Sequence, residues 1–278
     1  MPLRPVLPAI LPAALIALAA CSSPDEVREK TGVTAQATSA SAHATSVASS
    51  SAKGAARKEA ENNDLYSYEF SYPAEVGAYP ELAARLSSDA AKAKAEMIAD
   101  AKQDQSDRKK DDIPFNPYSY GAEWKVVADL PQYLSLSNDF STYTGGAHGN
   151  YGLESFVWDK ANKRGFKSEE FFTSPGALKD AIGKPLCDSL NKERVKKGMD
   201  PVTTEGKDQI WPACPDLDEA TVLVGSSNHR TFDRITVWYG PYVAGSYAEG
   251  AYELDFPMTR AMLDAVKPAY RGVFTAKH

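Results

Sequence analysis

The chain has 278 residues, of which 24% are charged and 43% hydrophobic, and its net charge is −6. This composition argues against a nucleic-acid partner, because there is no basic stripe that would neutralise phosphates. The lysine pairs at 109–110 and 196–197 are each followed by an acidic residue within a few positions, which is typical of solvated helix ends.

Residues 1–20 predict a secretory signal peptide. Arg4 and the amino terminus supply positive charge, and the stretch from Val6 to Ala20 is apolar apart from two prolines. A membrane-spanning helix is the alternative. It needs about 20 apolar residues, whereas this run is shorter and contains Pro8 and Pro12.

The sequence L-A-A-C at 18–21 resembles a bacterial lipobox, in which cleavage precedes a cysteine that is then lipidated. The alternative is an ordinary signal peptide with a cysteine near its cleavage site. The resemblance implies a lipid on Cys21, which would anchor the chain to a membrane. Ser22, rather than an aspartate, follows the cysteine. We therefore expect export to the periplasmic face of the outer membrane.

Residues 21–63 predict a disordered tether between the lipid and the folded part. Alanine, serine and threonine dominate, and residues 22–63 contain no Phe, Tyr, Trp, Leu or Ile. Such a segment cannot bury enough apolar surface to offset the entropy of ordering it. We assign no role to His43, which lies within it.

The chain contains three cysteines. If Cys21 carries a lipid, Cys187 and Cys214 remain as a pair, and outside the cytoplasm such a pair is typical of a disulfide. Two buried free thiols are the alternative.

Residues 64–166 predict a strand, a long helix and an antiparallel meander. The alternating aromatic residues of Y-S-Y-E-F-S-Y predict a strand ending at Pro73, and Pro80 opens an alanine-rich helix with a solvated exit at 104–112. Further strands are expected at 122–130, 133–144 and 152–159, with a short one at F-K-S (166–168).

Residues 167–278 predict a second part. Ser174 can cap a helix that begins at Pro175, kinks at Pro185 and stops near Gly198. Strands are expected at 221–225, 233–239 and 251–256, followed by a closing helix at 257–268. The predicted fold class is α+β, with antiparallel sheets each packed with helices in two small adjoining subdomains.

Three stretches together resemble a known pair of envelope modules: Y-T-G-G-A-H-G-N (143–150), E-F-F (170–172) and G-P-Y-V-A-G-S-Y-A-E-G-A-Y-E-L-D-F-P (240–257). Residues 64–166 resemble the accessory module beside the catalytic domain of PdaC-type peptidoglycan deacetylases. Residues 167–278 resemble the C-terminal module of RsiV-type anti-sigma factors, a domain-of-unknown-function family. The RsiV-type ectodomain binds lysozyme, so the resemblance implies a lysozyme-like protein or a peptidoglycan-like glycan as partner.

The catalytic and signalling parts of those families are not found in this sequence. A deacetylase needs an aspartate and an H-x-x-x-H pair for its metal, and the histidines at 43, 148, 229 and 278 do not pair in that way. An anti-sigma factor needs a cytoplasmic segment and a spanning helix. We therefore expect no metal, no cofactor and a stand-alone, lipid-anchored ectodomain.

The glycine-histidine loop and the tyrosine-rich C-terminal stretch supply the candidate binding residues. They are Tyr143, Gly145, Gly146, His148, Asn150, Tyr151, Tyr242 and Glu249. Aromatic faces beside an amide suit a glycan or a protein partner. The alternatives are a turn that needs glycine for positive φ, and packing of Tyr239, Tyr242, Tyr247 and Tyr252 on a sheet. His229 is expected to be exposed and to have no functional role. Asp216, Asp218 and Glu219 are expected to form a solvated turn.

These observations predict a non-catalytic cell-envelope binding module. One alternative is a cell-wall hydrolase that uses His148 with an acidic partner such as Glu249. The other is a purely structural envelope lipoprotein. The missing metal-ligand spacing and the missing nucleophile motif favour the binding module over the hydrolase.

Overall fold

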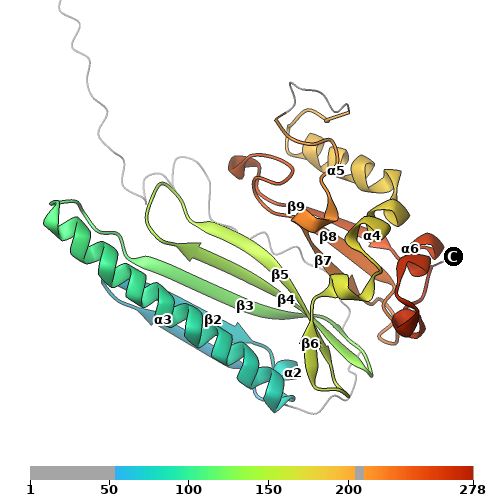
Figure 1. Cartoon of the computed structure of the whole chain (residues 1–278), viewed down its shortest axis with the longest axis horizontal. Helices are drawn as coiled ribbons and strands as arrows, with labels where there is room; N and C mark the ends of the chain where they lie inside the picture. The colour runs from blue at the N-terminus through green and yellow to red at the C-terminus, as the bar shows by residue number, and fades with distance from the viewer. Residues whose placement is uncertain (1–53, 204–209, 278) are drawn as a thin grey trace, which may run out of the picture. The chain divides into compact units, whose positions relative to one another are not determined.

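The computed structural model describes residues 54–203 and 210–277, and these residues form two β-sheets with helices packed against them (Figure 1). The predicted α+β fold class is confirmed. The predicted signal peptide, Cys21 and most of the predicted tether lie outside the described residues.

The first sheet has six strands in the spatial order of the chain. They are β1 (Arg57–Asn62), β2 (Tyr66–Tyr72), β3 (Tyr118–Asp129), β4 (Tyr133–Tyr143), β5 (Asn150–Asp159) and β6 (Arg164–Phe166). Each predicted strand of this part is present, although the last one is centred earlier than F-K-S. All neighbouring strands are antiparallel except β2 and β3, which are parallel.

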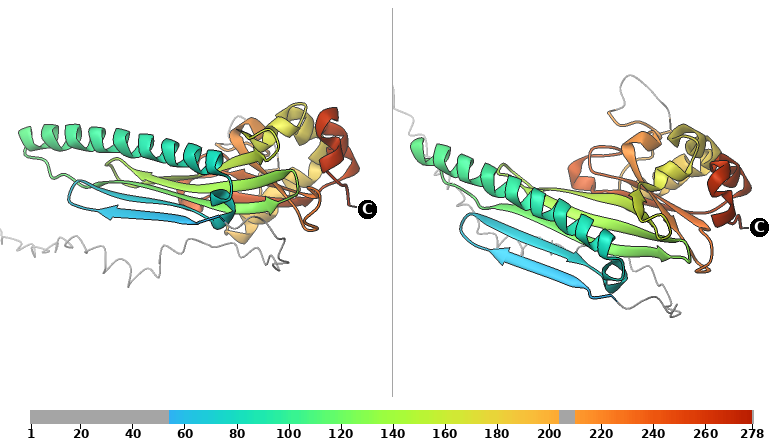
Figure 2. Two further views of the ribbon diagram at one scale, coloured as in Figure 1. Left: turned by 90° about the horizontal axis from the view of Figure 1, so that it is seen from below. Right: turned by 60° about the horizontal axis from the view of Figure 1, so that its bottom comes forward.

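The parallel pair follows from the long helix between its strands. Helix α3 (Pro80–Lys110) runs along one face of the sheet and packs on β2 and β3 (Figures 1 and 2). A crossover of this length returns the chain in the same direction. Its buried stripe is Leu82, Leu86, Ala90, Met97 and Ala101, which repeats at helical spacing.

Helix α3 is longer than predicted, because residues 104–110 belong to it. Arg108 pairs with Asp104 and Lys110 pairs with Asp107 at helical spacing, and the basic residues of the last turn suit its negative dipole end. No described helix combines the length and the apolar character that crossing a bilayer requires.

The prediction that the tether extends to Asn63 is wrong for its last residues, because β1 pairs along its length with β2. The Asn63 side chain accepts hydrogen bonds from the amides of Leu65 and Tyr66 and closes the turn between the strands. Strand β1 lies at the sheet edge and is almost wholly exposed. It therefore needs no large apolar residue, and its charges protect the edge from association.

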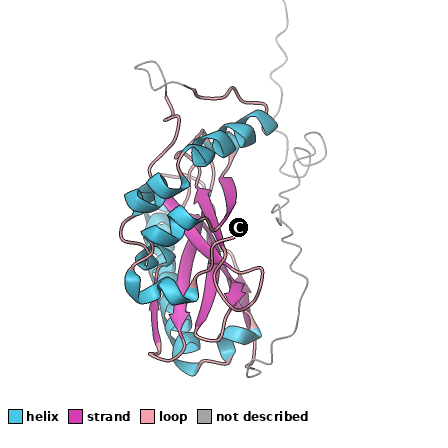
Figure 3. Ribbon diagram, turned by 90° about the vertical axis from the view of Figure 1, so that its right-hand side faces the viewer, coloured by secondary structure: helices cyan, strands magenta, loops and turns pink. Residues whose placement is uncertain are grey.

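The second sheet is antiparallel and consists of β7 (Ala220–Gly225), β8 (Arg234–Tyr239) and β9 (Tyr252–Pro257). Its helices lie beside the strands (Figure 3). They are α4 (Pro175–Ile182), α5 (Lys184–Lys196) and α6 (Arg260–Ala265). Shorter helical segments are α2 (Ala74–Gly77), η1 (Ser168–Phe171), η2 (Leu217–Glu219), η3 (Tyr247–Glu249) and η4 (Pro268–Val273).

The expected cap at Ser174 is present, because its side chain accepts a hydrogen bond from the Ala177 amide. The single kinked helix that was expected is instead two helices. Gly183 has φ of 64° and separates them. Pro185 lies in the first turn of α5, where the missing N–H costs nothing.

Helix α5 is fixed to the following segment in two ways. A disulfide joins Cys187 to Cys214, with Cα atoms 5.1 Å apart, so the predicted pairing is confirmed. A cross-link over this separation stabilises a protein by about 3–4 kcal/mol in the chain-entropy model. The buried guanidinium of Arg194 donates to the carbonyl oxygens of Pro212 and Ala244, at 2.9 Å each. These bonds also hold the loop that precedes η3.

The buried side chains form two clusters. One lies between α3 and the first sheet. The larger cluster surrounds the second sheet and also contains Ala128, Leu130, Tyr133 and Val157 of the first part. At its centre the ring of Phe171 is fully buried, and it lies 5.1–5.5 Å from the rings of Tyr133, Phe166, Phe232, Tyr270 and Phe274. The division predicted between 166 and 167 is therefore crossed by a shared core.

Candidate functional site

The glycine-histidine loop is the turn between β4 and β5. Gly145 and Gly146 have φ of 89° and 92°, in the region that favours glycine. The Tyr143 hydroxyl donates to the Gly146 carbonyl oxygen at 3.1 Å and closes the turn. These three residues form the bend of the loop, whereas the exposed Asn150 begins β5 opposite Thr142.

His148 lies against the loop between β8 and β9. Its ring stacks on the Tyr247 ring, with centroids 3.9 Å apart and planes 22° from parallel. Nδ1 lies 2.8 Å from the Gly149 carbonyl oxygen, and Nε2 lies 3.4 Å from the Tyr242 hydroxyl. A proton on Nδ1 satisfies the first contact and leaves Nε2 to accept from the tyrosine. Both ring nitrogens therefore have protein partners.

The two loops are joined by further contacts to Tyr247. Its hydroxyl donates to the Gly149 carbonyl oxygen at 2.8 Å, and its ring contacts Tyr151 edge to face at 5.9 Å. The structure thus brings together His148, Tyr151 and Tyr242 of the predicted site. Tyr247 completes this group, which we call the tyrosine junction. The sequence shows a run of tyrosines here, but nothing in it distinguishes Tyr247 from the tyrosines that pack on the sheet.

Glu249 comes from the same C-terminal loop but faces its own turn. One carboxylate oxygen accepts from the Ser246 amide and hydroxyl, at 2.8 and 2.9 Å, and the other accepts from the Tyr252 hydroxyl at 2.6 Å. Burial by itself raises the pKa of Glu249. The hydrogen bonds from Tyr252 and Ser246, with the charge of Arg194, outweigh burial, so the net pKa lies below its ordinary value. Glu249 is thus a cap of η3.

These contacts do not assemble the acid/base pair of the hydrolase alternative. In residues 54–203 and 210–277, no carboxylate lies within hydrogen-bonding distance of His148. The same residues contain no group of three or more metal-ligating side chains that could hold a metal ion. Tyr239 and Tyr252 are fully buried, as sheet packing requires. Asp216 forms an ion pair with Lys179.

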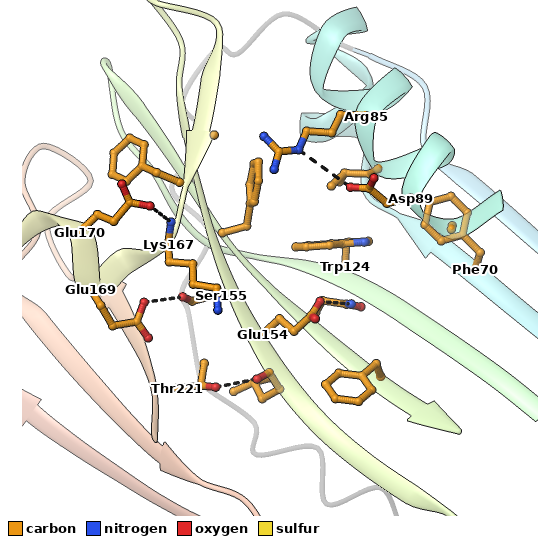
Figure 4. A pocket seen from close by; sticks show the side chains of 18 of the residues that line it. Phe70, Arg85, Asp89, Trp124, Glu154, Ser155, Lys167, Glu169, Glu170 and Thr221 are labelled. Atoms are coloured by element: carbon orange, nitrogen blue, oxygen red, sulfur yellow. Dashed lines mark hydrogen bonds and ion pairs between the residues drawn. The ribbon is translucent and has the colours of Figure 1, made fainter. Parts of the chain in front are cut away.

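A cleft of about 710 Å³ lies between α3, the first sheet and the segment that leads from β6 into the second sheet (Figure 4). Aromatic side chains line it together with charged and amide groups. The lining includes Arg85, Asp89, Tyr120, Trp124, Asn138, Phe140, Glu154, Phe156, Lys167, Glu169 and Thr221. The sequence predicted these strands but not their register, so this site was missed.

Two glycines shape the aromatic floor of the cleft. The Phe140 ring lies over Gly152, where an added Cβ would be 2.3 Å from it. The Phe156 ring lies over Gly165, where an added Cβ would be 1.8 Å away. Cross-strand pairing of an aromatic residue with glycine allows the ring to lie flat on the neighbouring strand. Each ring therefore needs glycine beneath it.

A polar row crosses the floor. Trp124 on β3, Asn138 on β4 and Glu154 on β5 lie directly opposite one another, which places their side chains within contact of their neighbours. The Asn138 amide nitrogen donates to Glu154 at 2.9 Å. Because a carboxylate only accepts, this bond orients the amide. Asn138 is only 4% exposed, and its oxygen Oδ1 has no hydrogen-bond partner in the described part of the chain.

The far wall of the cleft is held by Glu169. One of its oxygens accepts from the Val222 amide at 3.1 Å and the other from the Ser155 hydroxyl at 3.3 Å (Figure 4). The Thr221 hydroxyl donates to the Leu153 carbonyl oxygen at 2.7 Å. These bonds join β7 to β5 and use both oxygens of Glu169. The wall is therefore a structural connection between the sheets.

The first part of the chain matches a known protein family. Residues 59–151 match the family model described as Deacetylase PdaC, which confirms the expected resemblance for that segment. The matched residues run from β1 to the start of β5 and include Trp124, Asn138 and His148. No curated protein matches the chain.

Two solved structures are similar to the chain. A member of the DUF3298 family from Bacteroides fragilis is 19% identical, with a TM-score of 0.46, over 80% of this chain and 98% of that one. A DUF3298 family protein from Pseudomonas aeruginosa is 17% identical, with a TM-score of 0.47, over 82% of this chain and 99% of that one.

The stacked pair His148–Tyr247 should contribute to stability. In a double-mutant cycle, His148→Ala and Tyr247→Ala should show a coupling free energy of about 0.5–1.5 kcal/mol, because a stacked ring pair contributes that much beyond its buried area. Urea unfolding of both single variants and the double variant measures it. Tyr66→Ala, on the first sheet, is the control partner and should not couple to His148→Ala. If the effects of His148→Ala and Tyr247→Ala on the unfolding free energy were fully additive, the stacked rings would contribute no coupling free energy, against the prediction.

Glu249 should make stability depend on pH. Its pKa is lower in the folded chain than in the unfolded chain, so the ionised carboxylate stabilises the fold above the unfolded pKa of about 4.3. This stabilisation is lost as the pH falls through the lower, folded pKa. Glu249→Gln should therefore reduce the unfolding free energy near neutral pH and by less in acid. Unfolding of both proteins across this pH range tests it, with the exposed Glu219→Gln as control. A constant difference between Glu249→Gln and the unaltered chain would contradict the prediction.

Proposed function

We propose that the chain is a lipid-anchored, non-catalytic binding module of the bacterial cell envelope, and that the cleft holds a glycan chain. The observation that carries this proposal is the aromatic floor of the cleft with the hydrogen-bonded side chains of Asn138 and Glu154 set into it. The match to the PdaC family model supports an accessory role in the envelope.

The lining of the cleft suits the chemistry of a sugar. A pyranose has apolar C–H faces that pack on aromatic rings and an equator of hydroxyl or amide donors. Trp124 is partly exposed and meets the Phe156 ring edge to face at 5.9 Å. Its remaining surface can receive one sugar face. Glu154, one of whose oxygens makes no hydrogen bond within the described residues, can accept from one donor of the sugar.

The geometry argues against the alternative of turnover by His148. Both nitrogens of His148 already contact protein atoms, and both oxygens of Glu169 hold the wall of the cleft. A general acid or base needs a free atom within reach of the substrate. The tyrosine junction would then serve to dock the two loops, with the exposed Tyr151 and Tyr242 as its outer surface.

Trp124 should be required for retention on cell-wall material. The full chain, kept soluble in a mild detergent, is mixed with insoluble peptidoglycan and, separately, with immobilised lysozyme. Trp124→Ala should reduce retention on peptidoglycan at least about tenfold, because a central aromatic contact contributes about 2 kcal/mol or more. Trp238→Ala, a partly exposed tryptophan of the second sheet, is the control and should be retained. Retention on lysozyme alone, unaffected by Trp124→Ala, would replace the glycan with a protein partner.

The membrane anchor depends on Cys21. If this cysteine carries the lipid, Cys21→Ser should move most of the protein from the membrane fraction to the soluble fraction, since an anchor of two or more acyl chains is otherwise stable. Metabolic labelling with a radioactive fatty acid measures the lipid directly, and Cys187→Ser/Cys214→Ser is the control that should keep its label. Equal labelling of Cys21→Ser would disprove the anchor.

A further inference from the structure

The polar row of the cleft offers acceptors and few donors. Asn138 Oδ1 is unpartnered but buried, and Glu154 has one oxygen that makes no hydrogen bond to residues 54–203 or 210–277. Asp89, on α3, is exposed and lies 3.9 Å from the nearest guanidinium nitrogen of Arg85. In the close view, Trp124 is drawn between Asp89 and Glu154 (Figure 4). A ligand that fits here must therefore bring hydrogen-bond donors.

The two carboxylates also make this part of the cleft electronegative. Burial raises the pKa of Tyr120, and the nearby charges of Glu154 and Asp89 raise it further. Tyr120 lies four residues before Trp124 on β3, on the same face of the strand. A positive charge beside Trp124 would therefore meet the carboxylate of Glu154 and an aromatic face, whereas Asp89 already pairs with Arg85.

The cations that line the cleft are Arg85, which forms an ion pair with Asp89, and Lys167. The Arg85 guanidinium stacks on the Phe156 ring at 4.8 Å from its centre. Lys167 is on the far wall and forms no ion pair with Glu154 in the described part of the chain. The remaining acidic groups are occupied, because Glu169 holds the wall and Glu170 accepts from the Lys167 amide. Among the described residues, Glu154 thus has no cationic partner.

We infer that the cleft selects amino sugars whose amine is free over those whose amine is acetylated. The ammonium group would donate to the second oxygen of Glu154, while the sugar ring packs on Trp124. An acetamido group offers one N–H donor and no charge, and it adds bulk beside Glu154. This inference rests on the proposed glycan-binding function and names the chemical group that the site would recognise.

Titration calorimetry of the full chain with two soluble oligosaccharides tests the inference. One is a glucosamine pentamer and the other is an N-acetylglucosamine pentamer. The glucosamine pentamer should bind at least about tenfold more tightly, because one hydrogen bond to a charged group accounts for that ratio. Glu154→Gln keeps the bond to Asn138 but removes the charge, so it should abolish the preference. Glu123→Gln, an exposed carboxylate on the same strand as Trp124, is the matched control and should leave the preference intact.

The outcomes separate the inference from the function on which it rests. Equal binding of the two pentamers, or tighter binding of the acetylated one, would overturn the inference and leave the glycan-binding function standing. No binding of either pentamer would overturn both. A third titrant, Nα-acetyl-lysine amide, carries an ammonium group without a sugar ring and should bind at least about tenfold more weakly than the glucosamine pentamer. Equally tight binding would show that the cleft recognises any primary ammonium, against the proposed sugar contact.

Discussion

The contact on which the rest of the structure depends is the burial of the Phe171 ring between the two sheets. It contacts Tyr133 of the first sheet, Phe232 before β8 and Phe274 near the C-terminus, at 5.2–5.5 Å. An aromatic ring buries about 150–250 Å² and prefers edge-to-face neighbours, and the rings of Tyr133 and Phe274 are nearly perpendicular to that of Phe171. This packing holds η1 in place, and Glu169 of η1 forms the far wall of the cleft. The shape of the cleft therefore depends on this aromatic core.

The tyrosine junction connects the same two parts of the chain at another place. His148 and Tyr247 come from hairpin loops of different sheets, and their stacked rings and shared Gly149 carbonyl oxygen join these loops. The glycines beside His148 are explained by backbone geometry, since two consecutive residues have positive φ. A histidine in a glycine-rich loop resembles a catalytic feature in the sequence. In the fold, His148 joins the two loops, and both of its ring nitrogens contact protein atoms.

The sequence predicted the strands and helices well wherever hydrophobic periodicity is strong, as in α3 and in the strands that follow it. It failed where another effect governs. Strand β1 has no apolar signal because an edge strand needs none, and Gly183 ends α4 two residues before the proline that seemed to kink it. The cleft could not be predicted from the sequence, for a different reason. Trp124 precedes Asn138 by 14 residues and Asn138 precedes Glu154 by 16, and only the register of the three strands aligns them.

Gly152 and Gly165 have a consequence for how the cleft would change between related sequences. Its depth is determined by the two positions where side chains are missing, since each bears the flat ring of a phenylalanine. An alanine at either position would lift that ring toward the opening and narrow the space, while every group that can hydrogen-bond stays in place. The size of the cleft and its hydrogen-bonding groups are thus set by separate residues. A single methyl group at Gly152 or Gly165 would narrow the cleft and leave its polar chemistry intact.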